Sequence, residues 1–236
     1  KFQFSVGVPA NTFFASASQV MRPLQLKFID SDESCNLSIN QLKKDVGDYL
    51  YSKVIGVNLY GQPLDFDEIF KHVKKEDFIG DFCQSHFSTY KDKQISSLCL
   101  LSVYSFYTTK SIGCFGESGC LCTNDSSLAE YARSLRNHGR SKEGYSHNYI
   151  SGNLRGDEIQ AAVLNVKLRH FPDIIEERIN IVNRYENNLK NNLKIKLLLE
   201  KQNCRVVPYV FPIFIDKRDK VKKELLDRGI NTMIHY

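Results

Sequence analysis

The stretch Val54-Ile-Gly-Val-Asn-Leu59 decides the fold class, because it is a short apolar run with β-branched residues that a turn closes at once. The turn is Tyr60-Gly-Gln-Pro63, and a helical pattern over 65–73 follows it. The next strand is predicted over 77–81. A strand, a helix and a second strand in this order predict two parallel strands joined by a crossover helix.

The same alternation extends toward the start of the chain. Apolar runs predict strands over 2–8 and 24–29, and helical patterns predict helices over 12–21 and 38–46. Together these elements predict an α/β fold with a mostly parallel sheet flanked by helices.

The pattern changes after residue 95. Two strands are predicted over 95–106 and 112–123, around a tight loop rich in glycine and cysteine. A helix with a capping box at Ser127 and Glu130 follows, and Gly139 ends it.

Two further helices are predicted over 157–170 and 173–191, separated at Pro172. The remainder is predicted as a strand over 205–215, a helix over 217–228 and a strand over 230–236. We therefore predict a large domain over 1–172 and a smaller α+β domain over 173–236.

Composition excludes several classes of protein. The chain has 236 residues and a net charge of +5, with basic and acidic residues interspersed, whereas a nucleic-acid surface normally shows clustered basic residues. The seven cysteines include no C-x-x-C pair, so neither a zinc site nor a disulfide framework is expected. No apolar run approaches the ~18 residues of a membrane span. We expect a cytoplasmic protein with reduced thiols and no metal.

Four polar residues follow predicted strands, namely Asp81, Gln84, Ser105 and Lys110. Ligands of parallel α/β sheets bind at the carboxyl ends of the strands, where a lysine could act as a Schiff-base nucleophile and a carboxylate could hold a pyridinium. Taken singly, however, Lys110 reads as a solvated loop lysine and Asp81 equally well as a helix N-cap. Gln84 and Ser105 read as local hydrogen-bonding residues. Spacing alone leaves these alternatives open.

An ordered set of motifs covers essentially the whole chain. The motifs are Val8-Pro-Ala-Asn-Thr-Phe13, Leu59-Tyr-Gly-Gln-Pro63, Asp81-Phe-Cys-Gln84, Ser105-Phe-Tyr-Thr-Thr-Lys110-Ser-Ile-Gly113, Gly116-Glu-Ser-Gly119, Arg136-Asn-His-Gly139, Gly152-Asn-Leu-Arg155-Gly-Asp-Glu-Ile-Gln160 and Gly229-Ile-Asn-Thr-Met-Ile-His235-Tyr236. In this combination the sequence closely resembles the DegT/DnrJ/EryC1/StrS family of sugar aminotransferases.

The resemblance implies a fold-type I scaffold that binds pyridoxal 5'-phosphate and works as a homodimer with the active site at the subunit interface. Lys110 matches the lysine that forms the internal aldimine and then moves the substrate proton. Asp81 matches the acid that keeps the pyridine nitrogen protonated. Phe13 falls at the aromatic residue that stacks on the cofactor ring, although on its own it would be read as a core aromatic.

The same resemblance assigns four further residues. Gln84 matches a glutamine beside the cofactor ring, and Ser105 matches a hydroxyl that binds its phosphate. Asn153 falls at an asparagine that reaches the phosphate from the neighbouring subunit, and without the resemblance it is an ordinary turn residue. His235 falls where a histidine approaches the substrate, and alone it is an ordinary strand residue.

The implied reaction is a two-step transamination. An amino acid, expected to be L-glutamate, converts the cofactor to pyridoxamine phosphate, which then aminates a nucleotide-linked keto-deoxysugar. The related deoxysugar dehydratases carry histidine at the position of Lys110, so the lysine favours amine transfer over C–O cleavage.

One alternative remains from the comparison of motifs. The chain starts just before Thr12 and Phe13 and stops at Tyr236, so we expect the family's N-terminal phosphate-binding loop and the end of its small domain to be missing. The alternative is accordingly a catalytically silent, truncated paralogue or fragment that acts only as a dimer partner.

Overall fold

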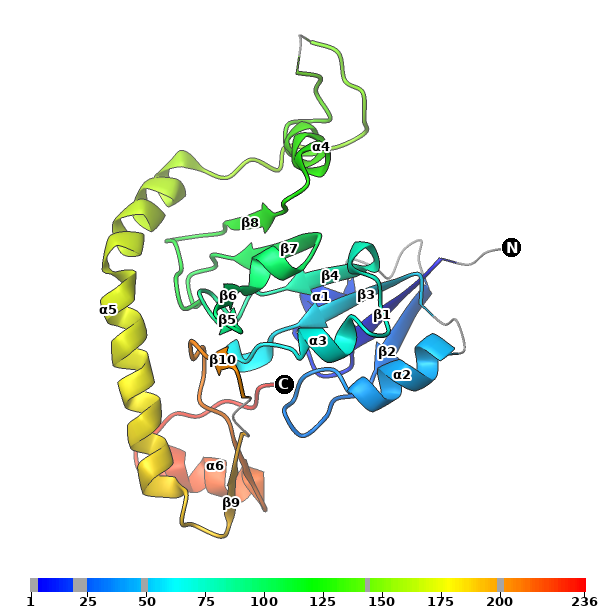
Figure 1. Ribbon diagram of the computed structural model, residues 1–236. Coiled ribbons are helices and arrows are strands. Elements are labelled where there is room, and N and C mark those ends of the chain that lie inside the picture. Colours follow the sequence, from blue (N-terminus) through cyan, green and yellow to red (C-terminus); the bar gives the residue numbers. More distant parts are fainter. Residues whose placement is uncertain (1–3, 19–24, 48–50, 143–144, 199–201) are drawn as a thin grey trace.

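A mixed six-stranded sheet forms the centre of the protein, in the order β2-β1-β3-β4-β7-β8 (Figure 1). The computed structural model describes residues 4–18, 25–47, 51–142, 145–198 and 202–236. The strands are β1 (Ser5–Pro9), β2 (Gln25–Ile29), β3 (Lys53–Val57), β4 (Phe78–Asp81), β7 (Leu101–Ser105) and β8 (Gly119–Cys122). All neighbours pair in parallel except β7 and β8, which form an antiparallel pair. The predicted α/β fold with a mostly parallel sheet is confirmed.

Short helices connect the parallel strands. They are α1 (Phe14–Ser18), α2 (Ile39–Gly47), α3 (Phe66–Ile69) and the 3-10 turns η1 (Leu59–Gly61), η2 (Lys75–Asp77) and η3 (Ile95–Leu98). The helix predicted over 65–73 is shorter than expected. Asp65 caps it by accepting from the backbone N–H of Glu68, but after Phe70 the chain continues only as turns.

Apolar clusters cover both faces of the sheet. Successive residues of a strand point to opposite faces, and β3 divides accordingly. Val54 packs with Leu64, Phe66 and other residues of one cluster, whereas Ile55 belongs to another with Val57. The sheet is therefore buried on both sides, as parallel sheets normally are.

The chain then forms the β7–β8 hairpin and an arm, which consists of residues 123–142 and 145–157 between β8 and the next long helix. β8 covers only the end of the strand predicted over 112–123, because residues 106–118 fold as an irregular loop. Helix α4 (Ser126–Arg136) follows, and its N-cap is Asp125, whose carboxylate accepts from the N–H of Leu128. The capping box predicted at Ser127 is wrong, since Ser127 lies inside the helix. In Figure 1, α4 and the loop after it stand clear of the sheet.

One long helix, α5 (Glu158–Leu189), runs along the side of the molecule (Figure 1). The prediction of two helices separated at Pro172 is wrong. A proline inside a helix removes one backbone hydrogen bond, yet Phe171 and Ile175 on either side of it are buried in one cluster with Ile112 and Val207. This packing holds the helix together across Pro172, so the predicted boundary falls within a continuous helix, and the division into 1–172 and 173–236 stays a prediction.

The last part of the chain is less regular than predicted. β9 (Ile195–Leu197) and β11 (Ile213–Ile215) form an antiparallel pair, and α6 (Arg218–Asp227) follows. β10 (Cys204–Arg205) instead joins β5 (Thr89–Tyr90) and β6 (Lys93–Gln94). The strand predicted over 205–215 is thus two short strands in different sheets.

Residues 228–236 contain no strand and run back toward the central sheet (Figure 1). The strand predicted over 230–236 is therefore wrong, because this segment is held by side-chain contacts, described below, in place of a ladder. Among the helices of the described residues, none has both the length and the apolar character needed to cross a membrane.

Candidate active site

The carboxyl ends of β4 and β7 lie next to each other and carry two of the predicted site residues. Asp81 is the last residue of β4, and it is in register with Val103 of β7. Ser105 is the last residue of β7. A turn follows, in which the backbone N–H of Lys110 donates to the carbonyl of Tyr107 at 2.9 Å. The parallel pairing of β4 and β7 therefore brings all three residues to one edge of the sheet.

Both oxygens of the Asp81 carboxylate are held in place. The hydroxyl of Ser16, in α1, donates to Oδ2 at 2.7 Å. The backbone N–H of Cys83 donates to Oδ1 at 3.2 Å. Two donors from separate segments fix the plane of this carboxylate.

The thiol of Cys83 lies within electrostatic reach of both Asp81 and Lys110. Burial raises the pKa of this thiol, the charge of Asp81 raises it further, and the charge of Lys110 opposes the increase. The charges of the carboxylate and of the amine therefore act in opposite directions on the same thiol. The raised pKa keeps Cys83 protonated at neutral pH, and a protonated thiol is a poor nucleophile.

The amine of Lys110 lies over an aromatic ring. Its Nζ lies 5.1 Å from the centroid of the Tyr209 ring, within cation–π distance. Burial and, second, the charge of Lys110 lower the pKa of His235. Lys110 therefore faces the end of the chain that returns from α6.

Hydrogen bonds hold this returning segment against the site. The phenol of Tyr60 donates to the backbone carbonyl of His235, and the side-chain amide of Gln84 donates to the phenol oxygen of Tyr236 at 2.6 Å. The Tyr236 ring also lies 5.9 Å from the ring of Phe13. The predicted residues Gln84, His235 and Phe13 are thus joined through the returning segment, on which the charges of Asp81 and Lys110 also act.

Phe13 is not a core residue, since its side chain is 55% exposed. It lies just before α1, with one ring neighbour in Tyr236. An open aromatic face beside the Asp81 carboxylate is compatible with stacking on a planar ligand.

Ser105 makes local contacts in this structure. Its hydroxyl accepts from the N–H of Tyr107 at 3.2 Å, and its carbonyl accepts from Nε2 of His86 at 2.8 Å. His86 is buried between the rings of Tyr104 and Phe106, and burial together with the charge of Lys110 lowers its pKa to about 4. A neutral imidazole therefore supports the end of β7.

Asn153 lies apart from the other predicted residues. It lies on the arm, where it forms an isolated antiparallel β-bridge with Asn137. Its side-chain oxygen accepts from the backbone N–H of Arg155 at 3.3 Å. Asn153 is exposed, and Figure 1 shows the arm standing away from the sheet. Within this chain, the fold does not bring Asn153 to Lys110.

Sequence reasoning missed four contributors to the site, namely Ser16, Tyr60, Tyr209 and Tyr236. Tyr60 and Tyr236 fall inside the motifs 59–63 and 229–236, but nothing in those motifs indicates that the two residues meet. Tyr209 has no such signal, because its position depends on a backbone hydrogen bond from its N–H to the carbonyl of Tyr60 at 3.2 Å. Contacts between segments this distant in sequence leave no local pattern.

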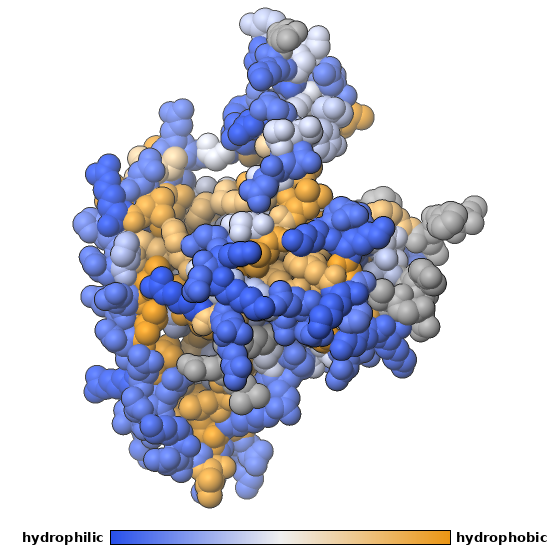
Figure 2. Space-filling view, viewed as in Figure 1, coloured by the Kyte–Doolittle hydropathy of each residue, from blue (hydrophilic) through white to orange (hydrophobic). Residues whose placement is uncertain are grey.

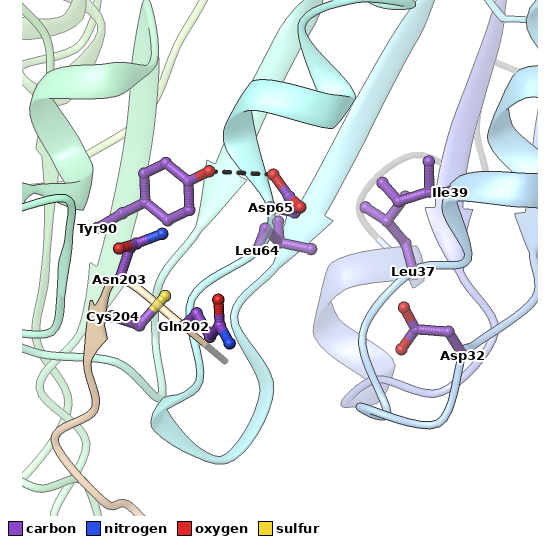
Figure 3. Close-up of a pocket in the computed structure, with 9 residues that line it drawn as sticks. All are labelled: Asp32, Leu37, Ile39, Leu64, Asp65, Tyr90, Gln202, Asn203 and Cys204. Carbon is purple, nitrogen blue, oxygen red and sulfur yellow. Dashed lines mark hydrogen bonds between the residues drawn. The ribbon is translucent and has the colours of Figure 1, made fainter. Parts of the chain in front are cut away.

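A separate pocket of about 240 Å³ lies between α3, β5 and β10. Figure 3 shows that Asp65 points toward Tyr90, whose phenol donates to it at 3.0 Å, while Asp32 comes from the far side of the pocket. None of the predicted site residues lines it. The predicted site is the cluster at the ends of β4 and β7, and this pocket is distinct from it.

The sequence profile of the DegT/DnrJ/EryC1/StrS aminotransferase family matches residues 4–236. The chain belongs to this family. Two solved structures with the same fold superpose with a TM-score of 0.93 and cover 99% of the chain. One is a DegT DnrJ EryC1 StrS aminotransferase from Brucella abortus, 31% identical, and the other is DesV of S. venezuelae in complex with a ketimine intermediate, 30% identical. The chain covers 65% and 64% of them, respectively.

Several curated relatives are named as aminotransferases of nucleotide sugars. The dTDP-3-amino-3,4,6-trideoxy-alpha-D-glucose transaminase of Streptomyces venezuelae is 34% identical over 78% of the chain and 48% of its own length. The dTDP-3-amino-3,6-dideoxy-alpha-D-galactopyranose transaminase of Aneurinibacillus thermoaerophilus is 32% identical over 97% of the chain and 63% of its own length. The chain therefore spans about half to two thirds of the length of the relatives it matches.

Proposed function

We propose that the protein is a pyridoxal 5'-phosphate-dependent aminotransferase that moves an amino group from an amino acid, L-glutamate, to a nucleotide-linked keto-deoxysugar. The observation that carries this proposal is the placement of Asp81 and Lys110 after the neighbouring strands β4 and β7, where the charges of both act on the thiol of Cys83. The names of the relatives support a nucleotide sugar as the acceptor.

The chemical groups around Asp81 fit pyridoxal phosphate. The site offers a fixed carboxylate for a protonated ring nitrogen, a primary amine for a carbonyl carbon, and the exposed ring of Phe13 for a planar heterocycle. Gln84 lies beside them, and Ser105 provides a hydroxyl at the strand end for a phosphate. When bound, pyridoxal phosphate supplies an electrophilic carbon and a ring that withdraws electrons from the substrate.

In the proposed reaction Asp81 and Lys110 have different tasks. Asp81 is oriented by Ser16 and Cys83, and its carboxylate would keep the ring nitrogen protonated. Lys110 Nζ would hold the carbonyl carbon of the cofactor at rest and, once displaced by substrate, would take the proton from the substrate carbon and deliver it to the carbon that Nζ had held. The aromatic group of Tyr209, His235 and Tyr236 orients the sugar beside the amine and excludes water.

We further propose that the protein acts as a homodimer in which the arm of one copy completes the site of the other. Asn153 is exposed on the arm and makes no contact with the Lys110 group of its own chain among the described residues. Figure 2 shows hydrophobic surface along α5 and over the middle of the molecule, which a second copy would cover. In such a dimer Asn153 reaches the phosphate of the partner's cofactor.

The direct test is to load the purified chain with pyridoxal phosphate, reduce it with borohydride and map the modified lysine by mass spectrometry. We expect the modification on Lys110 and its loss in Lys110→Ala. The matched control is Lys167→Met, because Lys167 also places its amine 5.1 Å from an aromatic ring, that of Phe115, and donates to the backbone carbonyl of Gly113. Modification that is spread over exposed lysines, or equal in both variants, would refute the assignment.

A screen of amino donors and nucleotide keto-sugars then tests the substrates. We expect more than one equivalent of the donor's keto acid per chain only when a nucleotide keto-sugar is present. A folded chain that binds the cofactor at Lys110 but turns over no keto-sugar would instead support the catalytically silent alternative.

A further inference from the structure

Two cysteines lie side by side on β8. Cys120 and Cys122 are separated by one residue, so their side chains point to the same face of an extended strand. Across the hairpin they are opposite Tyr104 and Ser102. Their Sγ atoms are 3.9 Å apart, and both are free thiols.

Small reagents can reach this pair. In the described residues β8 is the last strand of the sheet, and its ladder partner is β7. Cys120 is exposed and Cys122 is half-buried.

The pair also has the chemistry of a reactive thiol. A hydrogen bond from Cys120 favours the thiolate of Cys122 and lowers its pKa to about 7. The same interaction raises the pKa of Cys120, since its proton is shared with the neighbouring sulfur. A thiolate is the nucleophile in disulfide exchange, so Cys122 can attack and Cys120 can resolve.

An extended strand can accommodate a bond between these residues. At a rise of about 3.3 Å per residue, their Cα atoms lie about 6.6 Å apart. Disulfides span Cα separations of roughly 4.4–6.8 Å. A bond near this upper limit requires the strand to bend locally so that the two Cβ atoms approach each other, and strained bonds of this kind are readily reduced.

Two nearby thiols lack this combination. Cys83 is half-buried and has no second sulfur beside it among its hydrogen-bond partners in the described residues, and desolvation raises its pKa. Cys114 is buried, and its thiol donates to the carbonyls of Phe106 at 2.9 Å and Gly116 at 3.2 Å. Neither is exposed next to a second sulfur as Cys120 is.

We propose that Cys120 and Cys122 form a redox-active dithiol site, which small disulfides oxidise to a reversible intramolecular disulfide. The Cys122 thiolate attacks one sulfur of glutathione disulfide, so that a mixed disulfide forms and one glutathione thiolate leaves. Cys120, losing its proton to solvent, attacks Sγ of Cys122 and expels the second glutathione. In total, two cysteine thiols are oxidised and one glutathione disulfide is reduced to two glutathione molecules. This site is independent of the proposed transamination.

The test treats the reduced, folded chain with glutathione disulfide, alkylates the remaining thiols and measures the intact mass. We expect the loss of two alkylatable thiols, no retained glutathione, and full recovery of both thiols with dithiothreitol. Cleavage after Lys110, Glu117 and Arg133 separates Cys114 from the pair, so the peptide map locates the bond directly in the wild-type chain.

Single substitutions provide the controls. Cys120→Ser has no resolving thiol, so we expect it to retain one glutathione on Cys122. The matched control Cys114→Ala keeps the pair and should behave as the wild type does. Circular dichroism of each variant identifies any change that follows from misfolding.

Three outcomes would overturn the proposal. They are a wild-type chain that keeps glutathione on one cysteine, an internal bond that involves Cys83 or Cys114, and no loss of thiols from the folded chain. Since the wild-type peptide map alone distinguishes them, the result does not depend on whether the variants fold.

Discussion

The side-chain amide of Gln84 donates to the phenol oxygen of Tyr236, 152 positions later in the sequence, at 2.6 Å. The other end of the same amide accepts from the backbone N–H of Tyr60 at 2.9 Å. One buried side chain thus joins the turn after β3 to the segment that returns from α6. This link therefore holds Tyr60 and Tyr236 in their positions beside the candidate site.

We predict that Gln84→Ala lowers the free energy of unfolding by about 1–3 kcal/mol, because the buried N–H of Tyr60 loses its acceptor. Urea denaturation followed by circular dichroism measures the change. The control is Gln94→Ala, which removes an exposed amide and should alter stability by less than about 0.5 kcal/mol. Equal effects of the two substitutions would contradict the link.

We predict that Gly61→Ala is more destabilising than Gly229→Ala. Both glycines have positive φ, 97° and 78°. A Cβ on Gly61 would lie 2.1 Å from the carbonyl oxygen of Val207, whereas a Cβ on Gly229 meets nothing within 4 Å. Gly229→Ala should cost about 1 kcal/mol of backbone strain, and Gly61→Ala at least about 2 kcal/mol. Thermal melting of both variants provides the comparison, and similar values would show that the approach of Val207 is unimportant.

We predict that the protein loses stability as the pH falls from about 6.5 to about 4. Burial lowers the pKa of His86 to about 4, with Lys110 as the charged group facing it, while in the unfolded chain the pKa of histidine is about 6.5. The unfolded state therefore binds the proton first, and the stability present above pH 6.5 declines by about 3 kcal/mol toward pH 4.

The variant His86→Gln, which keeps a donor for Ser105, should flatten this dependence in urea denaturation across the same pH window. His170→Gln, which changes an exposed histidine of α5, should leave it as in the wild type. A steep loss of stability that persists in His86→Gln would assign the effect to other groups.

For the proposed transamination, we predict that Asp81→Asn lowers the turnover number by about 100-fold or more, because a neutral amide no longer keeps the ring nitrogen protonated. The control is Asp77→Asn, at the opposite end of β4, where the carboxylate pairs with Lys53 near the surface. That change should cost less than about 1 kcal/mol of stability and leave turnover intact. Equal turnover in Asp81→Asn and the wild type would remove Asp81 from the mechanism.

For the proposed dimer, we predict that mixing two inactive variants, Lys110→Ala and Asn153→Ala, restores activity. If Asn153 serves the partner's site, a mixed dimer contains one intact site, so random exchange restores about one quarter of the wild-type activity. Steady-state assays after subunit exchange measure it. If both residues act in the same subunit, every site in the mixture stays defective and no activity returns.

The sequence predicts the fold class well because periodicity is local. The strands β1 to β4 and the first turns between them follow from apolar runs of a few residues and from Gly and Pro. Asp81 and Lys110 could be placed at the ends of strands for the same reason. By contrast, the length of α5 depends on packing of Phe171 and Ile175 against Val207, which overrides the local effect of Pro172.

Long-range contacts account for the remaining errors. Residues 230–236 have the composition of a strand, yet Tyr60 and Gln84 bind the segment through its backbone and side chains and no neighbouring strand pairs with it. The position of Tyr209 over Lys110 likewise follows from the hydrogen bond to Tyr60. Neither contact can be predicted from neighbours along the chain.

The unbroken course of α5 has a mechanical consequence. Its 32 residues span about 48 Å as a single rod. Near one end, Gln160 accepts from the backbone N–H of Phe115 in the loop beyond Lys110, and the other end leads into β9. A tilt of about 5° around the first turn would carry the far end through about 4 Å. One continuous helix therefore connects the loop after the lysine with the β9–β11 pair, so that a displacement at one end would be transmitted to the other.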